Sequence, residues 1–146
     1  MPEEGTGNLI YSWKTHGQIL ELTELLARGM SHLGLCPEQR TEGKDFRFVG
    51  IIAKNREEWA VTALASLRSS VTIVPFYDSL SPDVIAFVLN QTELTSLFLE
   101  TKSFDTIVKL KREGKIRHLK HLVSYDPVAE EKVKEAAEVD LVVHIY

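Results

Sequence analysis

Polar side chains that could do chemistry follow several apolar segments, at the point where each segment ends. Because ligands of open parallel sheets bind beyond the carboxyl ends of the strands, these side chains would share one edge of such a sheet. They could hydrogen-bond a ligand there, but helix caps and turns use the same groups, and such structural roles are the favoured interpretation. The residues are Asn55, Arg56, Tyr77, Asp78, Ser79, Thr101, Ser124, Tyr125 and Asp126.

Two kinds of catalytic motif are missing from the chain. Neither Gly-x-Gly-x-x-Gly nor Gly-x-x-x-x-Gly-Lys-Ser/Thr occurs, so no glycine-rich turn offers phosphates a cradle of amide groups. No nucleophile elbow supports a Ser-His-Asp arrangement. Gly50 lies inside an apolar run, where it is expected to allow close packing of a helix. We therefore predict no catalytic residue in this chain.

The histidines do not indicate a metal site. None has the spacing to a carboxylate or cysteine that metal ligands show, so surface positions are the favoured interpretation. His118 and His121 are three residues apart at the start of a strand and are expected to point to opposite faces. The full set is His16, His32, His118, His121 and His144.

A cluster of cations covers the end of the fourth predicted helix and the residues after it. Such a cluster could bind phosphate or nucleic acid, but no aromatic side chains interleave with it. Cations are also stabilised at a helix C-terminus, and this is the favoured interpretation. We therefore expect no nucleic-acid partner. The residues are Lys109, Lys111, Arg112, Lys115, Arg117 and Lys120.

Composition places the chain among ordinary globular proteins. Its 146 residues fit one domain, and 17 basic and 21 acidic side chains give a net charge of -4, with no general attraction to nucleic acid or anionic membranes. Cys36 is the only cysteine, so no internal disulfide forms. The sequence shows no signal peptide, and its apolar runs are shorter than the roughly 18 residues of a membrane helix.

Apolar runs and helical stripes alternate along the chain. Helices are predicted over residues 16–33, 56–69, 82–92, 104–113 and 128–138, and strands are predicted to begin near residues 47, 71, 96, 119 and 141. Alternation in Leu9–Thr15, with Tyr11 and Trp13 on one face, predicts a further short strand. A polar loop is expected from Cys36 to Asp45.

Helix boundaries are predicted from capping signals. Thr15 with Gln18 and Asn55 with Glu58 have capping-box spacing. Ser81 precedes a proline, which is favoured in the first helical turn, and Ser103 is expected to cap the fourth helix. Gly34 is expected to end the first helix in a left-handed conformation.

Strands alternating with helices predict an α/β fold, with a mostly parallel sheet and flanking helices. We expect residues 1–146 to form a single α/β unit, with residues 1–8 flexible. The chain ends at Tyr146, directly on an apolar strand, whereas domain ends are usually polar. The expectation is that the protein continues, or that another chain covers this strand.

Several segments, in this order, resemble the N-terminal region of long-chain fatty acyl-CoA synthetases, in the adenylate-forming superfamily of AMP-binding enzymes. They are Tyr11-Ser-Trp-Lys-Thr15, the helix end at Gly34-Leu35, Val49-Gly-Ile-Ile-Ala-Lys-Asn-Arg-Glu-Glu-Trp59 and Val74-Pro-Phe-Tyr-Asp-Ser-Leu80. The resemblance extends from about Leu9 onward. It implies that the chain forms part of the N-terminal domain of an acyl-CoA synthetase-like fold.

The resemblance also implies an activity for a longer enzyme. Such ligases use ATP and Mg²⁺ to make an acyl-adenylate from a fatty acid, then transfer the acyl group to coenzyme A. Their catalytic motifs would lie beyond Tyr146, so none of these cofactors is expected to bind this chain alone. In related synthetases, the loop before the third helix approaches coenzyme A through glycines. Here Tyr77, Asp78 and Ser79 occupy that loop, which lacks glycine, and are the candidate contacts.

Two functions remain open from the sequence. In the first, the chain is part of a long-chain fatty acid–CoA ligase, and its partners are the rest of that enzyme or another protein chain, with fatty acid and coenzyme A as ligands of the complete enzyme. In the second, it is a non-catalytic binding or assembly subunit that retains part of the fold. The localisation is unknown from the sequence: with no signal peptide or transmembrane segment in this chain, the options are a cytoplasmic protein or one peripheral to an organelle membrane.

Overall fold

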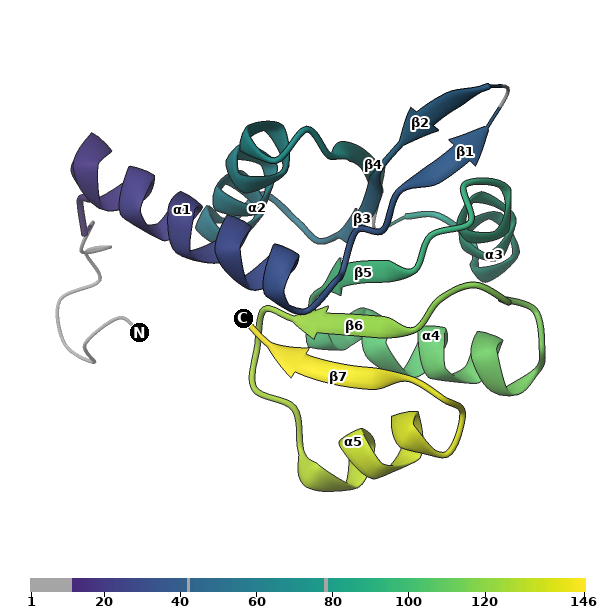
Figure 1. The fold of residues 1–146 in the computed structure, drawn as a ribbon. Helices are drawn as coiled ribbons and strands as arrows, with labels where there is room; N and C mark the ends of the chain where they lie inside the picture. The colour runs from purple at the N-terminus through teal and green to yellow at the C-terminus, as the bar shows by residue number, and fades with distance from the viewer. Residues whose placement is uncertain (1–11, 42, 78) are drawn as a thin grey trace, which may run out of the picture.

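Five parallel strands form the centre of the molecule, and each corresponds to a predicted apolar run (Figure 1). The computed structural model describes residues 12–41, 43–77 and 79–146. Within them the strand order is β4-β3-β5-β6-β7, so the chain reverses direction across the sheet between β3 and β5. The strands are β3 (Phe48–Ile52), β4 (Thr72–Phe76), β5 (Ser96–Leu99), β6 (His121–Ser124) and β7 (Val142–Ile145).

Helices cover both faces of this sheet, which confirms the predicted α/β class. On one face, α1 and α2 pack over β3, β5 and β6 around Ile51, Phe98 and Val123. On the other, α3, α4 and α5 bury a larger cluster that includes Leu97 and Leu122. The helices are α1 (His16–His32), α2 (Glu57–Arg68), α3 (Pro82–Gln91), α4 (Thr101–Arg112) and α5 (Glu130–Ala137).

Two of the predicted helix starts are confirmed. Thr15 and Gln18 form a complete capping box at α1, and Ser81 accepts a hydrogen bond from the amide of Val84 with Pro82 in the first turn of α3. Gly34 has a φ of 62°, as a left-handed helix end requires.

The other two starts were predicted at the wrong residue. α2 is capped by Arg56 rather than Asn55, and no side chain of its own caps it. α4 begins at Thr101 after the cap residue Glu100, two residues before the predicted cap Ser103. At α4 a long-range side-chain contact, described below, replaces the local capping signal.

Two further predictions need correction. The segment predicted as a polar loop contains a small antiparallel ribbon, β1 (Gln39–Thr41) with β2 (Lys44–Phe46). No strand covers residues 12–15, where Trp13 is 89% exposed. The rest of the predicted strand Leu9–Thr15, including Tyr11, and the flexible segment 1–8 lie outside the described residues.

Gly50 allows close packing, although its neighbours are not on a helix. A Cβ atom at this position would lie 2.7 Å from a side-chain carbon of Leu97 on β5 and 3.1 Å from Phe76 on β4. A third close atom belongs to Leu94, just before β5. The glycine in the middle of β3 therefore makes room for side chains of the two adjacent strands.

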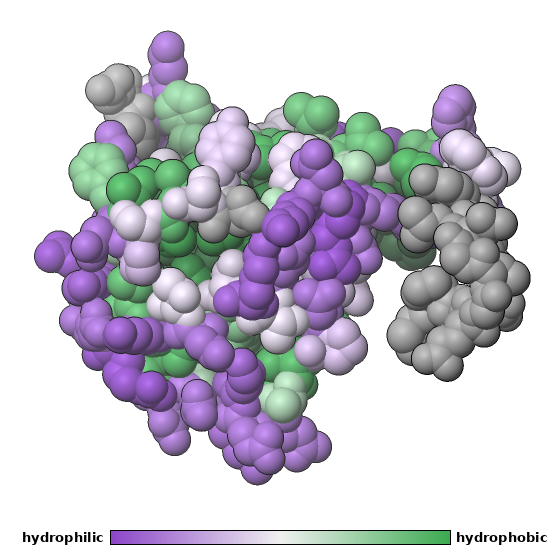
Figure 2. Space-filling view, turned by 180° about the vertical axis from the view of Figure 1, so that it is seen from behind, coloured by the Kyte–Doolittle hydropathy of each residue, from purple (hydrophilic) through white to green (hydrophobic). Residues whose placement is uncertain are grey.

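The outer surface of the α3–α5 layer is divided between polar and apolar side chains. Figure 2 shows hydrophilic side chains over α4 and α5, and hydrophobic ones toward α3, where Val84 and Phe87 are exposed. Among the described residues, no helix combines the length and apolar character needed to cross a membrane.

Candidate functional site

Five side chains of the predicted polar row and its surroundings meet at the carboxyl edge of the sheet. Arg56 follows β3, Thr101 follows β5, and Tyr125 and Asp126 follow β6, while Glu58 belongs to the first turn of α2. Because β3, β5 and β6 are adjacent, loops far apart in sequence come together here. We refer to these five residues as the carboxyl-edge network.

The guanidinium of Arg56 lies at the centre of the network. Its Nε donates to Oε2 of Glu58 at 2.7 Å, and its Nη2 donates to Oε1 of the same carboxylate at 3.1 Å. Its Nη1 donates to Oδ1 of Asp126 at 3.0 Å. The guanidinium carbon also lies 5.3 Å from the ring centroid of Tyr125, a cation–π distance. One cation thus joins two carboxylates and an aromatic ring.

Asp126 connects this cation to the start of α4. Its Oδ2 accepts hydrogen bonds from the backbone amide and the hydroxyl of Thr101, both at 3.2 Å. A carboxylate at a helix N-terminus satisfies an otherwise unpaired amide and interacts favourably with the helix dipole. Asp126 therefore caps a helix that starts 25 residues earlier in the chain.

Tyr125 anchors the network to the core. Its ring is 7% exposed and lies against Phe98, with centroids 5.9 Å apart. Its hydroxyl donates to Oγ1 of the buried Thr62 on α2 at 3.0 Å, and that hydroxyl in turn donates to the carbonyl of Glu58. The network is thereby fixed to both β6 and α2.

The electrostatics keep all three charged groups ionised at neutral pH. The hydrogen bond to Glu58 is the main cause that raises the pKa of Arg56. The same contact lowers the pKa of the Glu58 carboxyl. Burial works against ionisation of Asp126, but hydrogen bonds from Thr101 and Arg56 lower its pKa overall. Burial raises the pKa of Tyr125, so its hydroxyl stays protonated.

The network leaves little capacity for a phosphate. In sheets of this strand order, ligands bind at the point where the order reverses, which lies here between β3 and β5. At that point the backbone amide of Lys54 donates to Oε1 of Glu100 at 2.9 Å, so a carboxylate occupies the amide that a phosphate would use. The five residues of the network do not fit ATP and Mg²⁺, because the guanidinium of Arg56 and the N-terminus of α4 already hold carboxylates.

Tyr77 and Ser79, two of the three predicted coenzyme A contacts, are not members of the network. Tyr77 is 76% exposed and lines an open groove of about 770 Å³ beyond the ends of β3 and β4. Ser79 is exposed, and Asp78 lies outside the described residues. The other lining residues are Ala53, Lys54, Asn55, Trp59, Pro75 and Phe76.

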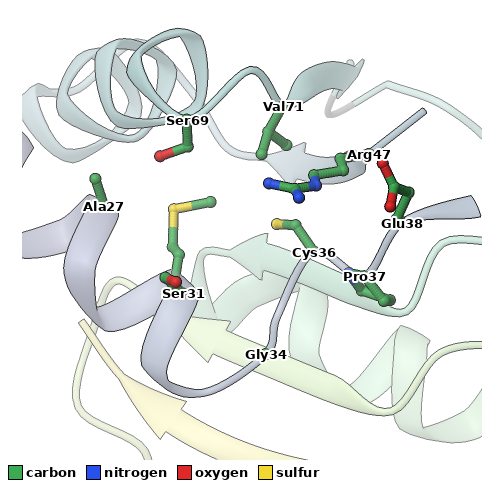
Figure 3. A pocket seen from close by; sticks show the side chains of 10 residues that line it. Ala27, Ser31, Gly34, Cys36, Pro37, Glu38, Arg47, Ser69 and Val71 are labelled. Carbon is green, nitrogen blue, oxygen red and sulfur yellow. The ribbon is translucent and has the colours of Figure 1, made fainter. Parts of the chain in front are cut away.

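A second cavity, of about 340 Å³, lies at the opposite edge of the sheet, between the end of α1 and the starts of β3 and β4 (Figure 3). The Cys36 sulfur and the Arg47 guanidinium point into it, with Ser69 across from them. Burial raises the pKa of the Cys36 thiol to about 12, although Arg47 opposes the shift. The thiol is therefore protonated at neutral pH and a poor nucleophile.

Cations of the predicted basic cluster make several contacts within the protein. Lys111 donates to the carbonyls of Arg117 and Leu119, and Lys115 pairs with Asp83 and Glu113. These contacts agree with a structural role near the end of α4.

One pair of polar residues was not foreseen from the sequence. Nδ1 of His121 on β6 lies 3.2 Å from Nε2 of His144 on β7, although 23 residues separate them. Only the pairing register of two predicted strands could have revealed this contact.

Known proteins share both the sequence pattern and the fold. The chain is 30% identical over 128 residues to long-chain-fatty-acid–CoA ligase 5 of Mus musculus, a match that covers 87% of this chain and 18% of the ligase. It is 26% identical over 145 residues to fatty acyl-CoA synthetase B of Dictyostelium discoideum, which covers 99% of this chain and 20% of that protein. The chain thus spans about a fifth of the length of these curated relatives.

Solved structures of adenylating enzymes have the same fold. The A-PCP didomain of carboxylic acid reductase from Segniliparus rugosus, in complex with AMP, superposes with a TM-score of 0.70 at 15% identity, over 90% of this chain and 19% of that one. Coronafacic acid ligase from Pectobacterium brasiliense superposes with a TM-score of 0.61 at 18% identity, over 78% of this chain and 21% of that one. Residues 7–144 match the family model of AMP-binding enzymes. The resemblance seen in the sequence is confirmed, and the chain belongs to the AMP-binding enzyme family.

Proposed function

We propose that this chain is the N-terminal portion of an ATP-dependent long-chain fatty acid–CoA ligase and that it is not active alone. The observation that carries the proposal is the family match over residues 7–144, together with relatives that are long-chain fatty acyl-CoA ligases about five times as long. The longer protein would form an acyl-adenylate and then acyl-CoA, with ATP, Mg²⁺ and coenzyme A as its cofactors.

The geometry supports a positioning role for this portion. Arg56 is already bound to Glu58 and Asp126, and Asp126 to Thr101, so these groups hold the starts of α2 and α4 at one edge of the sheet. Adenylation requires donors arranged around phosphates where charge develops. Residues elsewhere in the longer protein would supply those donors.

The exposed Tyr77 and its groove support a further part of the proposal. We place coenzyme A in the complete enzyme near Tyr77, Asp78 and Ser79, since an exposed aromatic ring beside a groove can contact an adenine or a pantetheine arm. A Tyr77→Ala variant of the longer protein would then raise the KM for coenzyme A and leave fatty-acid-dependent pyrophosphate exchange unchanged.

The second candidate is a non-catalytic binding or assembly subunit. The paired state of the carboxyl-edge network favours it as well, because that network offers no catalytic group. The two candidates differ in the length of the native polypeptide that carries this sequence: it is a much longer ligase in the first and a short subunit in the second.

A single purification separates the candidates. Antibodies against this chain should capture a polypeptide much larger than 16.5 kDa that exchanges pyrophosphate into ATP only when a fatty acid such as palmitate is added. The isolated 146-residue chain should show no exchange above a control without protein. Capture of a 16.5 kDa polypeptide without exchange would favour the assembly subunit, and exchange by the isolated chain would refute the claim of inactivity.

A further inference from the structure

Two imidazole rings on neighbouring strands form a group of metal-ligating atoms that the carboxyl-edge network does not use. Val123 on β6 is paired with His144 on β7, which places His144 diagonally opposite His121 on the same face of the sheet. The ring centroids lie 5.4 Å apart with an interplanar angle of 38°, and both rings are half-buried. The two nitrogens that face each other are 3.2 Å apart.

This separation fits two arrangements of the ring nitrogens. In the first, one nitrogen carries a proton and donates it to the lone pair of the other. In the second, both lone pairs point at one cation. Two Zn–N bonds of about 2.0–2.1 Å at a tetrahedral angle separate the nitrogens by about 3.3–3.4 Å. A square-planar cation with similar bonds separates them by about 2.9 Å. The observed distance lies between these two values.

We propose that His121 and His144 form a two-histidine site for a divalent transition-metal cation, with water molecules completing its coordination. Imidazole nitrogens suit Zn²⁺, Ni²⁺ and Cu²⁺, and the general order of affinity places Cu²⁺ above the others. Hard cations such as Mg²⁺ and Ca²⁺ prefer oxygen ligands, so they are not expected here.

The tautomers of the two rings decide whether both lone pairs are available. A neutral imidazole carries a single ring proton, on either of its two nitrogens. In the hydrogen-bonded pair, one ring has its proton on the nitrogen that faces the partner and the other has it on the far nitrogen. Binding of a cation to both facing nitrogens then needs only a change of tautomer in one ring.

The site is also reachable. The neighbouring Val142 is 52% exposed and lies on the same face of β7, and the core cluster beneath α1 and α2 includes no described residue of β7. The half-buried rings are thus open to solvent in part, and solvent would supply the water ligands that a two-histidine site needs.

The test is a titration of the full 146-residue chain with CuCl₂, NiCl₂ and ZnCl₂ in a non-chelating buffer at about pH 7.5. One equivalent of Cu²⁺ should bind, and MgCl₂ should give no signal. His121→Phe and His144→Phe keep an aromatic ring in place and should each weaken Cu²⁺ binding roughly tenfold or more. His118→Phe, in the exposed loop before β6, is the matched control and should bind as the unchanged chain does.

A second measurement on the unchanged chain keeps the proposal testable if a variant fails to fold. Long-range ¹H–¹⁵N spectra resolve the ring nitrogens, and Zn²⁺ should shift Nδ1 of His121 and Nε2 of His144 while His118 stays unchanged. Failure of all three transition metals to bind at millimolar concentration would overturn the proposal and leave a hydrogen-bonded pair. Equal Cu²⁺ affinity in the folded Phe variants would overturn it as well.

Discussion

The two faces of β7 are covered to different extents at the start of the strand. Val143 is half-buried and packs against the core cluster of the α3–α5 layer, and the strand contacts α5 directly. Val142 lies on the opposite face and is 52% exposed, and Tyr146 on that face is 40% exposed. Val142 and Val143, neighbouring residues of the same type, thus differ in cover at the start of β7, whereas Ile145, on the face of Val143, is 55% exposed and His144, on the face of Val142, is half-buried.

The difference follows from how far each helix layer extends. The core cluster beneath α1 and α2 ends at Val123 of β6 and at Tyr125, just after that strand. Parallel strands are usually buried on both faces, and large exposed apolar patches mark interfaces. We therefore expect another part of the longer protein, or another chain, to pack on the open face of β7.

Lysine substitutions on the two faces of β7 should give the largest contrast. Val143→Lys places an ammonium group against an apolar cluster, so we expect it to lower the free energy of unfolding by about 2–4 kcal/mol. Val142→Lys, on the open face, should change it by less than about 0.5 kcal/mol. Urea denaturation followed by circular dichroism measures both. Equal destabilisation by the two variants would contradict the comparison.

The same variants test what the open face does in solution. If its apolar side chains drive self-association, Val142→Lys should reduce the sedimentation coefficient of the concentrated chain toward that of a monomer. A chain that is monomeric without substitution would weaken the case for an interface there.

The sheet and its helices were predictable because their signals are local. Apolar runs and helical stripes gave the five strands and five helices, and the caps at Thr15 and Ser81 depend on residues within one turn. The cap of α4 was not predictable, since Asp126 reaches Thr101 from the adjacent strand. In the same way, the contact of His121 with His144 depends on strand register rather than on spacing.

The polar edge of the sheet should contribute less to stability than the covered face of β7. Arg56→Ala removes three charge-assisted hydrogen bonds from groups that are about a quarter to a third exposed, so a loss of about 1–2 kcal/mol is expected. Arg28→Ala is the matched control, because its pair with Glu24 is exposed on α1 and worth about 0–0.5 kcal/mol. Thermal unfolding measures both, and equal effects would show that the network is no stronger than a surface pair.

The smallest expected effect is a pH dependence that originates on the open face of β7. The folded protein lowers the pKa values of His121 and His144, mainly through burial, and the charges acting on His121 are those of His144 and Lys120. The unfolded chain, with histidine pKa values near 6.5, therefore binds more protons in mildly acidic solution. This contribution to stability is complete above about pH 6.5 and is lost as the pH falls through the lowered values, because protonation favours unfolding. Unfolding midpoints in urea at about pH 7.5 and pH 5.5 should show the loss, and His144→Phe should reduce it. The carboxylates of the network titrate only at lower pH, so they do not contribute in this range. If His144→Phe lost as much stability between about pH 7.5 and pH 5.5 as the unchanged chain, the effect would belong to other groups. The two histidines would then be as solvated on the open face of β7 as in the unfolded chain.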